Sequence, residues 1–277
     1  MLETDPRGFL SWDIVTRTMF TVFDTYVVKE LVHLRRQDDW TARWRPSLRE
    51  SSVGRPARFP LFPRSSPNLI HDAYTLCVFK ELTGVVPEQF ENVLEFGGGY
   101  GSMCRLFFNL GFSGTYVIFD LPMLSSLQAY YLGSSRIPIL SESSEALNRR
   151  GVHLVSEARQ LWELCARLRR GKWLFIGTWS ICETPLNVRN QFLPHVSNFD
   201  AFLIAFQKQF GEVNNCDFFA RWQEQTSNLV EWHLAAIKHL PGHYYLVGKR
   251  RTGDETPSSS PLVVVCPSTG DTAPRSA

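Results

Sequence analysis

The sequence has no excess of charge of either sign and no long apolar run. Its 277 residues include 29 Lys and Arg against 27 Asp and Glu, a formal net charge of +2. Such a balance gives no electrostatic reason to expect nucleic acid or an anionic membrane as a partner. No stretch reaches the roughly 18 apolar residues of a membrane-spanning helix, and the early Glu3, Asp5 and Pro6 are unlike a signal peptide. We therefore expect no nucleic-acid partner and no membrane span.

Cysteines are few and lack the spacing of a metal or redox site. The six stand at positions 77, 104, 165, 182, 216 and 266, and no two form a Cys-x-x-Cys pair. The common zinc-ligand spacings are therefore missing, and a disulfide framework is not expected in a chain of this length without a secretory signal. We expect reduced thiols, no bound metal and a cytoplasmic location.

The N-terminal region combines a helical stripe with a basic segment. Between Ser11 and His33 apolar residues recur every three to five positions, which predicts one amphipathic helix. This helix packs on the main domain or, alternatively, joins two copies in a homo-oligomer. Residues 35–64 hold eight arginines, three acids and four prolines, which predicts an irregular segment. That segment is a solvated surface or, if functional, covers the site mouth and attracts an anionic acceptor.

Strands and helices are expected to alternate from residue 93 onward, the pattern of a mostly parallel sheet with helices on its faces. The expected strands are 93–96, 115–119, 152–155, 173–178 and 243–247. A helix over 72–82, with Asp72 as its N-cap, precedes them. Helices are also expected at 103–110, 122–132, 161–168 and 232–240, and the spacing of four phenylalanines predicts one more, at Phe199, Phe202, Phe206 and Phe210.

We accordingly predict a doubly wound α/β fold with a helical N-terminal attachment. The attachment covers residues 1–70 and the α/β domain residues 71–250. After residue 249 the composition shifts to Gly, Pro, Ser and Thr, which predicts a disordered tail over 251–277.

A glycine-rich turn follows the first strand, in Val93-Leu94-Glu95-Phe96-Gly97-Gly98-Gly99-Tyr100-Gly101-Ser102. Glycines are needed where φ is positive or where backbone touches a ligand, and the next helix offers its first N–H groups there. The turn lacks the Lys-Ser or Lys-Thr of a phosphate-binding P-loop, and Ser102 stands where a dinucleotide fingerprint needs its third glycine. The pattern acid-x-Gly-x-Gly-x-Gly is met in full.

That pattern resembles motif I of the class I methyltransferases that use S-adenosylmethionine. The resemblance implies a donor site formed by Glu95, Phe96, Gly97, Gly98, Gly99 and Gly101, with the acid facing the cationic amino-acid moiety of the donor. Asp120, 25 residues after Glu95 and followed by Leu121, is placed to take both ribose hydroxyls. Nicotinamide-binding folds place an acid there too, so Asp120 supports the fold more than it selects the ligand. Glu157, in Ser156-Glu157-Ala158, looks like the acid that contacts adenine, or is a solvated loop residue.

Two further stretches make the resemblance more particular, namely Tyr116-Val117-Ile118-Phe119-Asp120-Leu121-Pro122 and Trp179-Ser180-Ile181-Cys182-Glu183-Thr184-Pro185. With the glycine turn and the shorter likeness Glu50-Ser51-Ser52-Val53-Gly54-Arg55-Pro56, they resemble the sugar O-methyltransferase family over residues 50–249. The resemblance implies transfer of a methyl group to a hydroxyl of a sugar or sugar-containing acceptor, which is a small molecule or a glycan.

Methyl transfer to a hydroxyl needs alignment and a base, and no metal. Glu183, five residues past the fourth strand, is the first candidate, although Ser-x-x-Glu is also the form of a helix capping box. His195 is the second candidate for this catalytic role. Trp179 is placed to stack on a sugar or on adenine, or is simply buried. Methylation at nitrogen or of a non-sugar small molecule, a catalytically silent binding partner, and a nicotinamide-dependent oxidoreductase are the alternatives.

Overall fold

The computed structural model describes residues 5–18, 26–141, 149–168 and 171–251, and a seven-stranded sheet forms its centre. The sheet order is β3-β2-β1-β4-β5-β9-β8. Its strands are β1 Asn92–Phe96, β2 Thr115–Phe119, β3 Gly151–Val155, β4 Trp173–Thr178, β5 Ala201–Gln207, β8 Val230–Ala236 and β9 His243–Arg250. The first five pair in parallel, and β9 is antiparallel to both of its neighbours. A two-stranded ribbon, β6 Gln209–Phe210 with β7 Val213–Asn214, follows β5.

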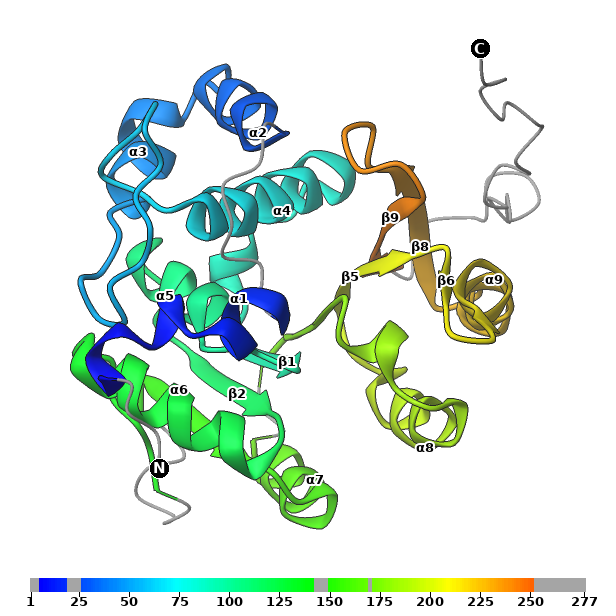
Figure 1. The fold of residues 1–277 in the computed structure, drawn as a ribbon. Coiled ribbons are helices and arrows are strands. Elements are labelled where there is room, and N and C mark those ends of the chain that lie inside the picture. Colours follow the sequence, from blue (N-terminus) through cyan, green and yellow to red (C-terminus); the bar gives the residue numbers. More distant parts are fainter. Residues whose placement is uncertain (1–4, 19–25, 142–148, 169–170, 252–277) are drawn as a thin grey trace.

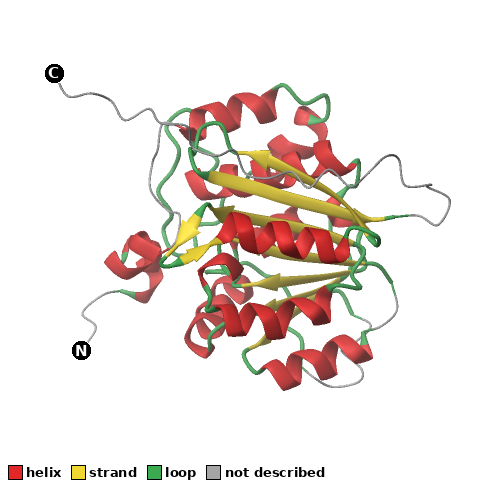
Figure 2. Cartoon of the chain, turned by 90° about the vertical axis from the view of Figure 1, so that its right-hand side faces the viewer, coloured by secondary structure: helices red, strands yellow, loops and turns green. Residues whose placement is uncertain are grey.

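Helices cover both faces of the sheet (Figures 1 and 2). One face packs on α4 Pro67–Thr83, α5 Ser102–Asn109 and α6 Pro122–Ser134, and the other on α7 Ala158–Arg167, α8 Leu186–Val196 and α9 Asn215–Thr226. Alternate residues of each strand enter the two cores, so β5 sends Leu203 to the first and Phe202 to the second. The predicted doubly wound α/β architecture is therefore confirmed.

The N-terminal region packs on the first of these faces. It contains α1 Asp13–Thr18, α2 Tyr26–Arg35 and α3 Arg45–Ser47, together with short turns at Pro6–Ser11 and Trp40–Trp44. The expected helical stripe is thus described as α1 and α2, and residues 19–25 lie outside the described residues. Tyr26, Val27, Leu31 and Leu34 of α2 are buried in the core that α4 shares, so the apolar side of this helix packs within its own chain.

The phenylalanine stripe at 199–210 does not form the predicted helix, because Phe202 and Phe206 lie in β5 and Phe210 lies in β6. Phe202 and Phe206 are four residues apart, which suits one side of a helix but also one side of a strand, where alternate residues share a face. Every residue from Ala201 to Phe206 is buried. Such an uninterrupted apolar run is typical of a strand covered on both faces, and burial between β4 and β9 selects the strand.

The predicted helix at 232–240 is also wrong, because Val230–Ala236 forms the edge strand β8. Its Leu and Ala residues favour a helix locally, but pairing with β9 along its whole length outweighs that preference. The expected closing strand at 243–247 is confirmed as part of β9.

Two smaller predictions also need correction. The first helix of the domain begins at Pro67 with Ser66 as N-cap, whose hydroxyl accepts from the Leu69 N–H at 3.1 Å, so Asp72 lies inside the helix. Cys77, Cys104, Cys165 and Cys182 carry free thiols, but Cys216 is disulfide-bonded, so the expectation of reduced thiols is wrong for Cys216. None of the helices in the described ranges is both long and apolar enough to cross a membrane. The predicted tail, residues 251–277, lies outside the described residues from position 252 onward.

Candidate active site

The ends of the parallel strands gather most of the predicted site residues at one edge of the sheet. Strands β1 to β5 run in the same direction, and β8 runs with them because it is antiparallel to β9. The residues that follow β1, β2, β3 and β4, and those that begin β9, therefore meet at the carboxyl edge. In open α/β sheets this edge is where ligands bind.

The glycine turn after β1 is built so closely that side chains are excluded. Gly97 has φ +73°, and a Cβ there would lie 2.4 Å from the Cβ of Ser180, which follows β4. Ser180 in turn donates a hydrogen bond to the Phe96 carbonyl. Gly99 and Gly101 also have positive φ, at 56° and 97°, and α5 begins directly after Gly101. No side chain caps α5, so its first N–H groups face the turn.

Glu95 lies beneath this turn. Its side chain is almost fully buried, and the Tyr116 hydroxyl donates to its carboxyl group at 2.9 Å. Burial raises the pKa of Glu95 to about 8, the Tyr116 hydrogen bond opposes the rise, and the nearby carboxylates of Asp72 and Asp120 add to it. At neutral pH the Glu95 carboxyl is therefore mostly protonated.

Asp120 lies beside the same turn, as its place after β2 predicted. Its carboxylate accepts from the Leu121 N–H and from the Gln128 amide of α6, both at 2.8 Å. Gln128 also donates to the Gly99 carbonyl at 2.9 Å, so one side chain ties the acid to the turn. Burial raises the pKa of Asp120, while hydrogen bonds from Leu121, Gln128 and the Gly98 and Gly99 backbone oppose that rise.

Two buried polar atoms beside the glycine turn have no partner within normal hydrogen-bond geometry among the described residues. They are the Gln128 Oε1 and the Ser102 Oγ. Gln128 is fully buried and Ser102 is 5% exposed. Because buried polar groups are normally paired, these two atoms are available to hydrogen-bond a polar ligand beside the glycine turn.

Glu157 and Leu121 are the exposed members of the predicted donor site. Glu157 follows β3, precedes α7 and makes no side-chain cap there. Leu121 is 66% exposed beside Asp120. Both lie at the carboxyl edge on the side of β2 and β3.

Trp179, directly after β4, has a strained backbone. Its φ of +59° is uncommon for a bulky residue and is typical of functional sites. The half-buried indole donates to His243 Nδ1 at 2.9 Å, and its ring lies 5.1 Å from that of His71. The end of β4, the start of β9 and α4 thus meet at Trp179.

A buried carboxylate lies next to this meeting point. Glu30 of α2 is fully buried, and one of its oxygens contacts both His71 Nδ1 and His239 Nε2 at 2.8 Å. Burial alone raises the pKa of Glu30 and lowers that of His71. The attraction between the Glu30 and His71 charges outweighs this effect of burial, so the pKa of Glu30 is lowered and the pKa of His71 is raised. Burial and the His71 charge lower the pKa of His243.

The two predicted catalytic residues lie in different places. Glu183 is exposed in a short turn after β4, at the carboxyl edge, where Gln207 of β5 donates to it at 3.0 Å. It does not form a capping box, because no side chain caps α8 and Pro185 is its N-cap. His195 lies in the last turn of α8, stacked on Trp162 of α7 with ring centroids 4.3 Å apart. The structure does not bring His195 to the strand ends.

Sequence reasoning missed several residues that the fold brings to this edge, namely Glu30, His71, Asp72, Gln128, His239 and His243. Their one shared signal in the sequence is position, in helices before β1 and after β2, in the turn before the last strand or at the first residue of that strand. His33, Cys77 and Glu81, between α2 and α4, place three metal-ligand atoms within 4.8 Å of one another outside this site. There His33 and Glu81 contact each other at 2.9 Å, and Gln37 donates to Glu81.

The strand order, the glycine turn after β1 and the acid after β2 together define a Rossmann-like class I methyltransferase fold. No family model matches the sequence, and no curated protein matches it. The resemblance to sugar O-methyltransferases therefore rests on the motifs alone.

Several solved structures are similar to this chain at about a tenth sequence identity. One is an O-methyltransferase family protein from Burkholderia thailandensis, 9% identical with a TM-score of 0.41, covering 82% of this chain and 69% of its own. Another is the methyltransferase domain of bacterial CtHen1, 10% identical with a TM-score of 0.45, covering 66% and 97%. A third is the 16S rRNA methylase ArmA, 11% identical with a TM-score of 0.40, covering 66% and 86%.

Proposed function

We propose that this chain is an S-adenosylmethionine-dependent methyltransferase acting on a hydroxyl of a sugar or sugar-like acceptor. The observation that carries the donor assignment is the glycine turn, closed against Ser180 and tied through Gln128 to Asp120. The unpartnered Gln128 and Ser102 oxygens fit a polar ligand there. In this proposal Asp120 binds the ribose hydroxyls, Glu157 and Leu121 lie along the adenine, and Phe96 with Gly97–Gly101 forms the wall beside the amino-acid moiety.

The acceptor is proposed to lie beyond Trp179, between β4, β9 and α4. S-adenosylmethionine supplies an activated methyl group when bound, so the chain has to align the acceptor and remove its hydroxyl proton. Glu183 is proposed as the base because it lies at this edge with an exposed carboxylate. Trp179 offers an indole face on which a sugar stacks. The proposal does not use His195, which lies at the far end of α8.

The donor site is tested by thermal unfolding with S-adenosylmethionine, S-adenosylhomocysteine and NAD. A ligand at about 100 times its dissociation constant adds roughly 2.7 kcal/mol of stability, a shift of roughly 5–10 °C for this size. We expect both adenosyl ligands to shift the wild type and not Gly99→Val, because valine is strained at φ +56°. Gly111→Val is the matched control, since Gly111 also has positive φ but closes α5 away from the turn. A shift with NAD alone would overturn the proposal.

The reaction is tested by release of S-adenosylhomocysteine with a panel of sugars, glycosides, phenols, amines and RNA. Glu183→Gln is expected to lower kcat by roughly 10²–10⁴-fold while leaving affinity for S-adenosylhomocysteine intact. Glu163→Gln, an exposed acid of α7, is the control. Unchanged turnover in Glu183→Gln rules out this base. Methylation of RNA alone rejects the sugar acceptor, and donor binding without any turnover favours a silent binding protein.

A further inference from the structure

The donor proposed above carries a cationic ammonium group, and its expected partner is poorly suited to it. Glu95 was expected to face this group, but its carboxyl lies under the turn and accepts from the Tyr116 hydroxyl. A Cβ on Gly98 would lie 3.1 Å from the Glu95 Oε2, so the turn itself covers the carboxyl. A neutral, covered carboxyl attracts a cation weakly.

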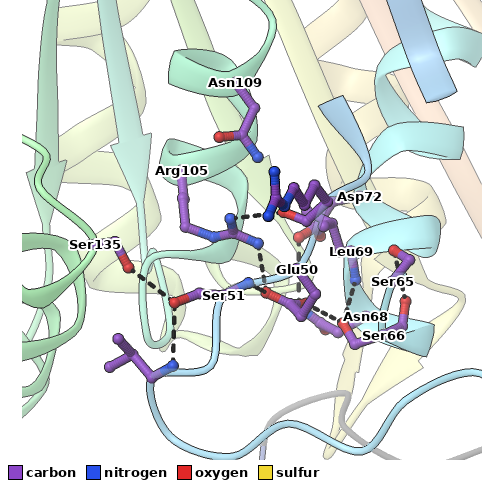
Figure 3. Close-up of polar contacts among 12 residues, drawn as sticks. Glu50, Ser51, Ser65, Ser66, Asn68, Leu69, Asp72, Arg105, Asn109 and Ser135 are labelled. Carbon is purple, nitrogen blue, oxygen red and sulfur yellow. Dashed lines mark hydrogen bonds and ion pairs between the residues drawn. The ribbon is translucent and has the colours of Figure 1, made fainter. Parts of the chain in front are cut away.

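Another carboxylate reaches the same turn from α4. Asp72 is partly exposed, and its carboxylate accepts from the Asn68 amide at 3.4 Å. The same Asn68 amide donates to the Tyr100 hydroxyl of the glycine turn at 2.9 Å. Asp72 also lies near enough to Glu95 to raise the pKa of that group. Figure 3 shows Asp72 and Asn68 on one side of the cluster that Glu50 forms with Arg105 of α5.

Asp72 remains ionised at neutral pH and makes no ion pair with a lysine or arginine of the described chain. Burial raises its pKa to about 6, opposed by Ser102 and His71 and supported by the carboxylates of Glu50 and Glu30. The nearby guanidinium, Arg105, is already paired with Glu50 and also donates to the Tyr131 hydroxyl. Asp72 is thus an anion beside the glycine turn, and the guanidinium of Arg105 is not available to neutralise it because it pairs with Glu50.

An independent observation indicates a ligand at this place. The Ser102 hydroxyl, at the start of α5, is 5% exposed and lies beside the Asp72 carboxylate, and it has no partner within normal hydrogen-bond geometry in the described chain. Beside it lie the uncapped first N–H groups of α5, which suit a carboxylate. The Asp72 carboxylate with the Ser102 hydroxyl beside it suits an ammonium group, and the first N–H groups of α5 suit a carboxylate, so the two charges of an amino acid are both matched.

We propose that Asp72, and not Glu95, is the carboxylate that binds the ammonium group of the donor's amino-acid moiety. The assignment rests on the proposed function, because it concerns the same donor. Glu95 instead holds the turn in shape from below through Tyr116. The uncapped start of α5 takes the carboxylate of the same moiety.

The test compares two ligands that differ in this moiety, S-adenosylhomocysteine and 5′-methylthioadenosine, which lacks the amino-acid group. Dissociation constants are measured by calorimetry on full-length wild type, Asp72→Asn and Glu95→Gln. We expect Asp72→Asn to weaken S-adenosylhomocysteine by about 10- to 100-fold, the loss of one charge-assisted contact, and 5′-methylthioadenosine by less than about threefold. Glu95→Gln is expected to leave the ratio of the two affinities within about threefold of wild type.

Retained 5′-methylthioadenosine binding shows that Asp72→Asn is folded at the site. Equal weakening of both ligands in this variant would assign Asp72 a structural role and overturn the proposal. If Glu95→Gln weakens binding of S-adenosylhomocysteine only, and Asp72→Asn binds both ligands like wild type, the ammonium group is bound by Glu95. That result would also overturn the proposal. If wild type binds neither ligand, the proposed function itself fails, and the assignment fails with it.

Discussion

Glu95 illustrates how burial changes the role of a single residue. In the sequence it is an acid at a strand end, and the donor motif suggests an anion there. In the structure it is 3% exposed and its pKa is raised to about 8, largely by burial. An acid that is neutral in the folded protein donates and accepts hydrogen bonds like an amide, which suits a structural position under a turn.

The pH dependence of stability tests this state of Glu95. The pKa is raised on folding, so the stabilisation is complete below the ordinary value of 4.5 and is lost as the pH rises through about 8. Glu95→Gln mimics the protonated form, so we expect it to unfold at a higher temperature than wild type at pH 8.5 and at a similar temperature at pH 4.5. Calorimetry at both pH values measures the difference, and Glu163→Gln controls for loss of surface charge. Parallel profiles for wild type and Glu95→Gln would contradict the raised pKa.

At the scale of elements, a buried ion pair fastens the segment before α4 to α5. Glu50 and Arg105 pair with side chains 1% and 6% exposed, and Ser66, the N-cap of α4, donates to the same carboxylate (Figure 3). Arg105 also donates to the Arg49 carbonyl at 3.1 Å. The segment that looked irregular and solvated in sequence is therefore anchored at this end beside the glycine turn.

Breaking this pair should cost much more than breaking a surface pair. We expect Glu50→Ala to lower the free energy of unfolding by about 3–5 kcal/mol, because it leaves a buried guanidinium unpaired. The double variant Glu50→Leu/Arg105→Met should recover part of that loss. Urea unfolding measures both, and Glu163→Ala, which breaks the exposed pair with Arg159, should change stability far less than Glu50→Ala. If Glu50→Ala lowers the free energy of unfolding by as little as Glu163→Ala does, the Glu50–Arg105 pair is solvated and the prediction is wrong.

For the whole molecule, Glu30 joins three parts that are far apart in the sequence. It lies on α2, and its two histidine partners lie on α4 and in the turn between β8 and β9. This contact holds the N-terminal region against the carboxyl edge of the sheet, next to the proposed acceptor position.

The strength of this contact should follow a defined pH window. The lowered pKa of Glu30 makes its contribution fade as the pH falls below the ordinary value of 4.5. The raised pKa of His71 makes its contribution fade as the pH rises above the ordinary value of 6.5. We expect Glu30→Gln to destabilise most near pH 5.5, by about 3–5 kcal/mol, and less at pH 9. Hydrogen exchange of residues 26–35 should rise in parallel, and an equal effect at both pH values would argue against an ionic contact.

Local patterns in the sequence determined much of the fold. The strands at 93–96, 115–119, 152–155 and 173–178, and the glycine turn with Asp120 beyond the next strand, follow from short apolar runs and from the steric need for glycine. These features depend on neighbouring residues, so they are visible without a structure. The helices predicted at 199–210 and 232–240 were wrong because the same apolar spacing suits a strand, and only pairing within the sheet decides between them.

What tertiary structure alone decided is which groups meet and in which charge state. Asp72 lies 23 residues before Glu95, yet packing of α4 on α5 brings both to one turn, and burial leaves one mostly ionised and the other mostly neutral. The contact of Glu30 with His239 spans 209 residues. Desolvation and long-range pairing depend on what surrounds a group in three dimensions. The sequence by itself therefore located the glycine turn, whereas the neighbours and ionisation of its carboxylates were set by the packing of the whole chain.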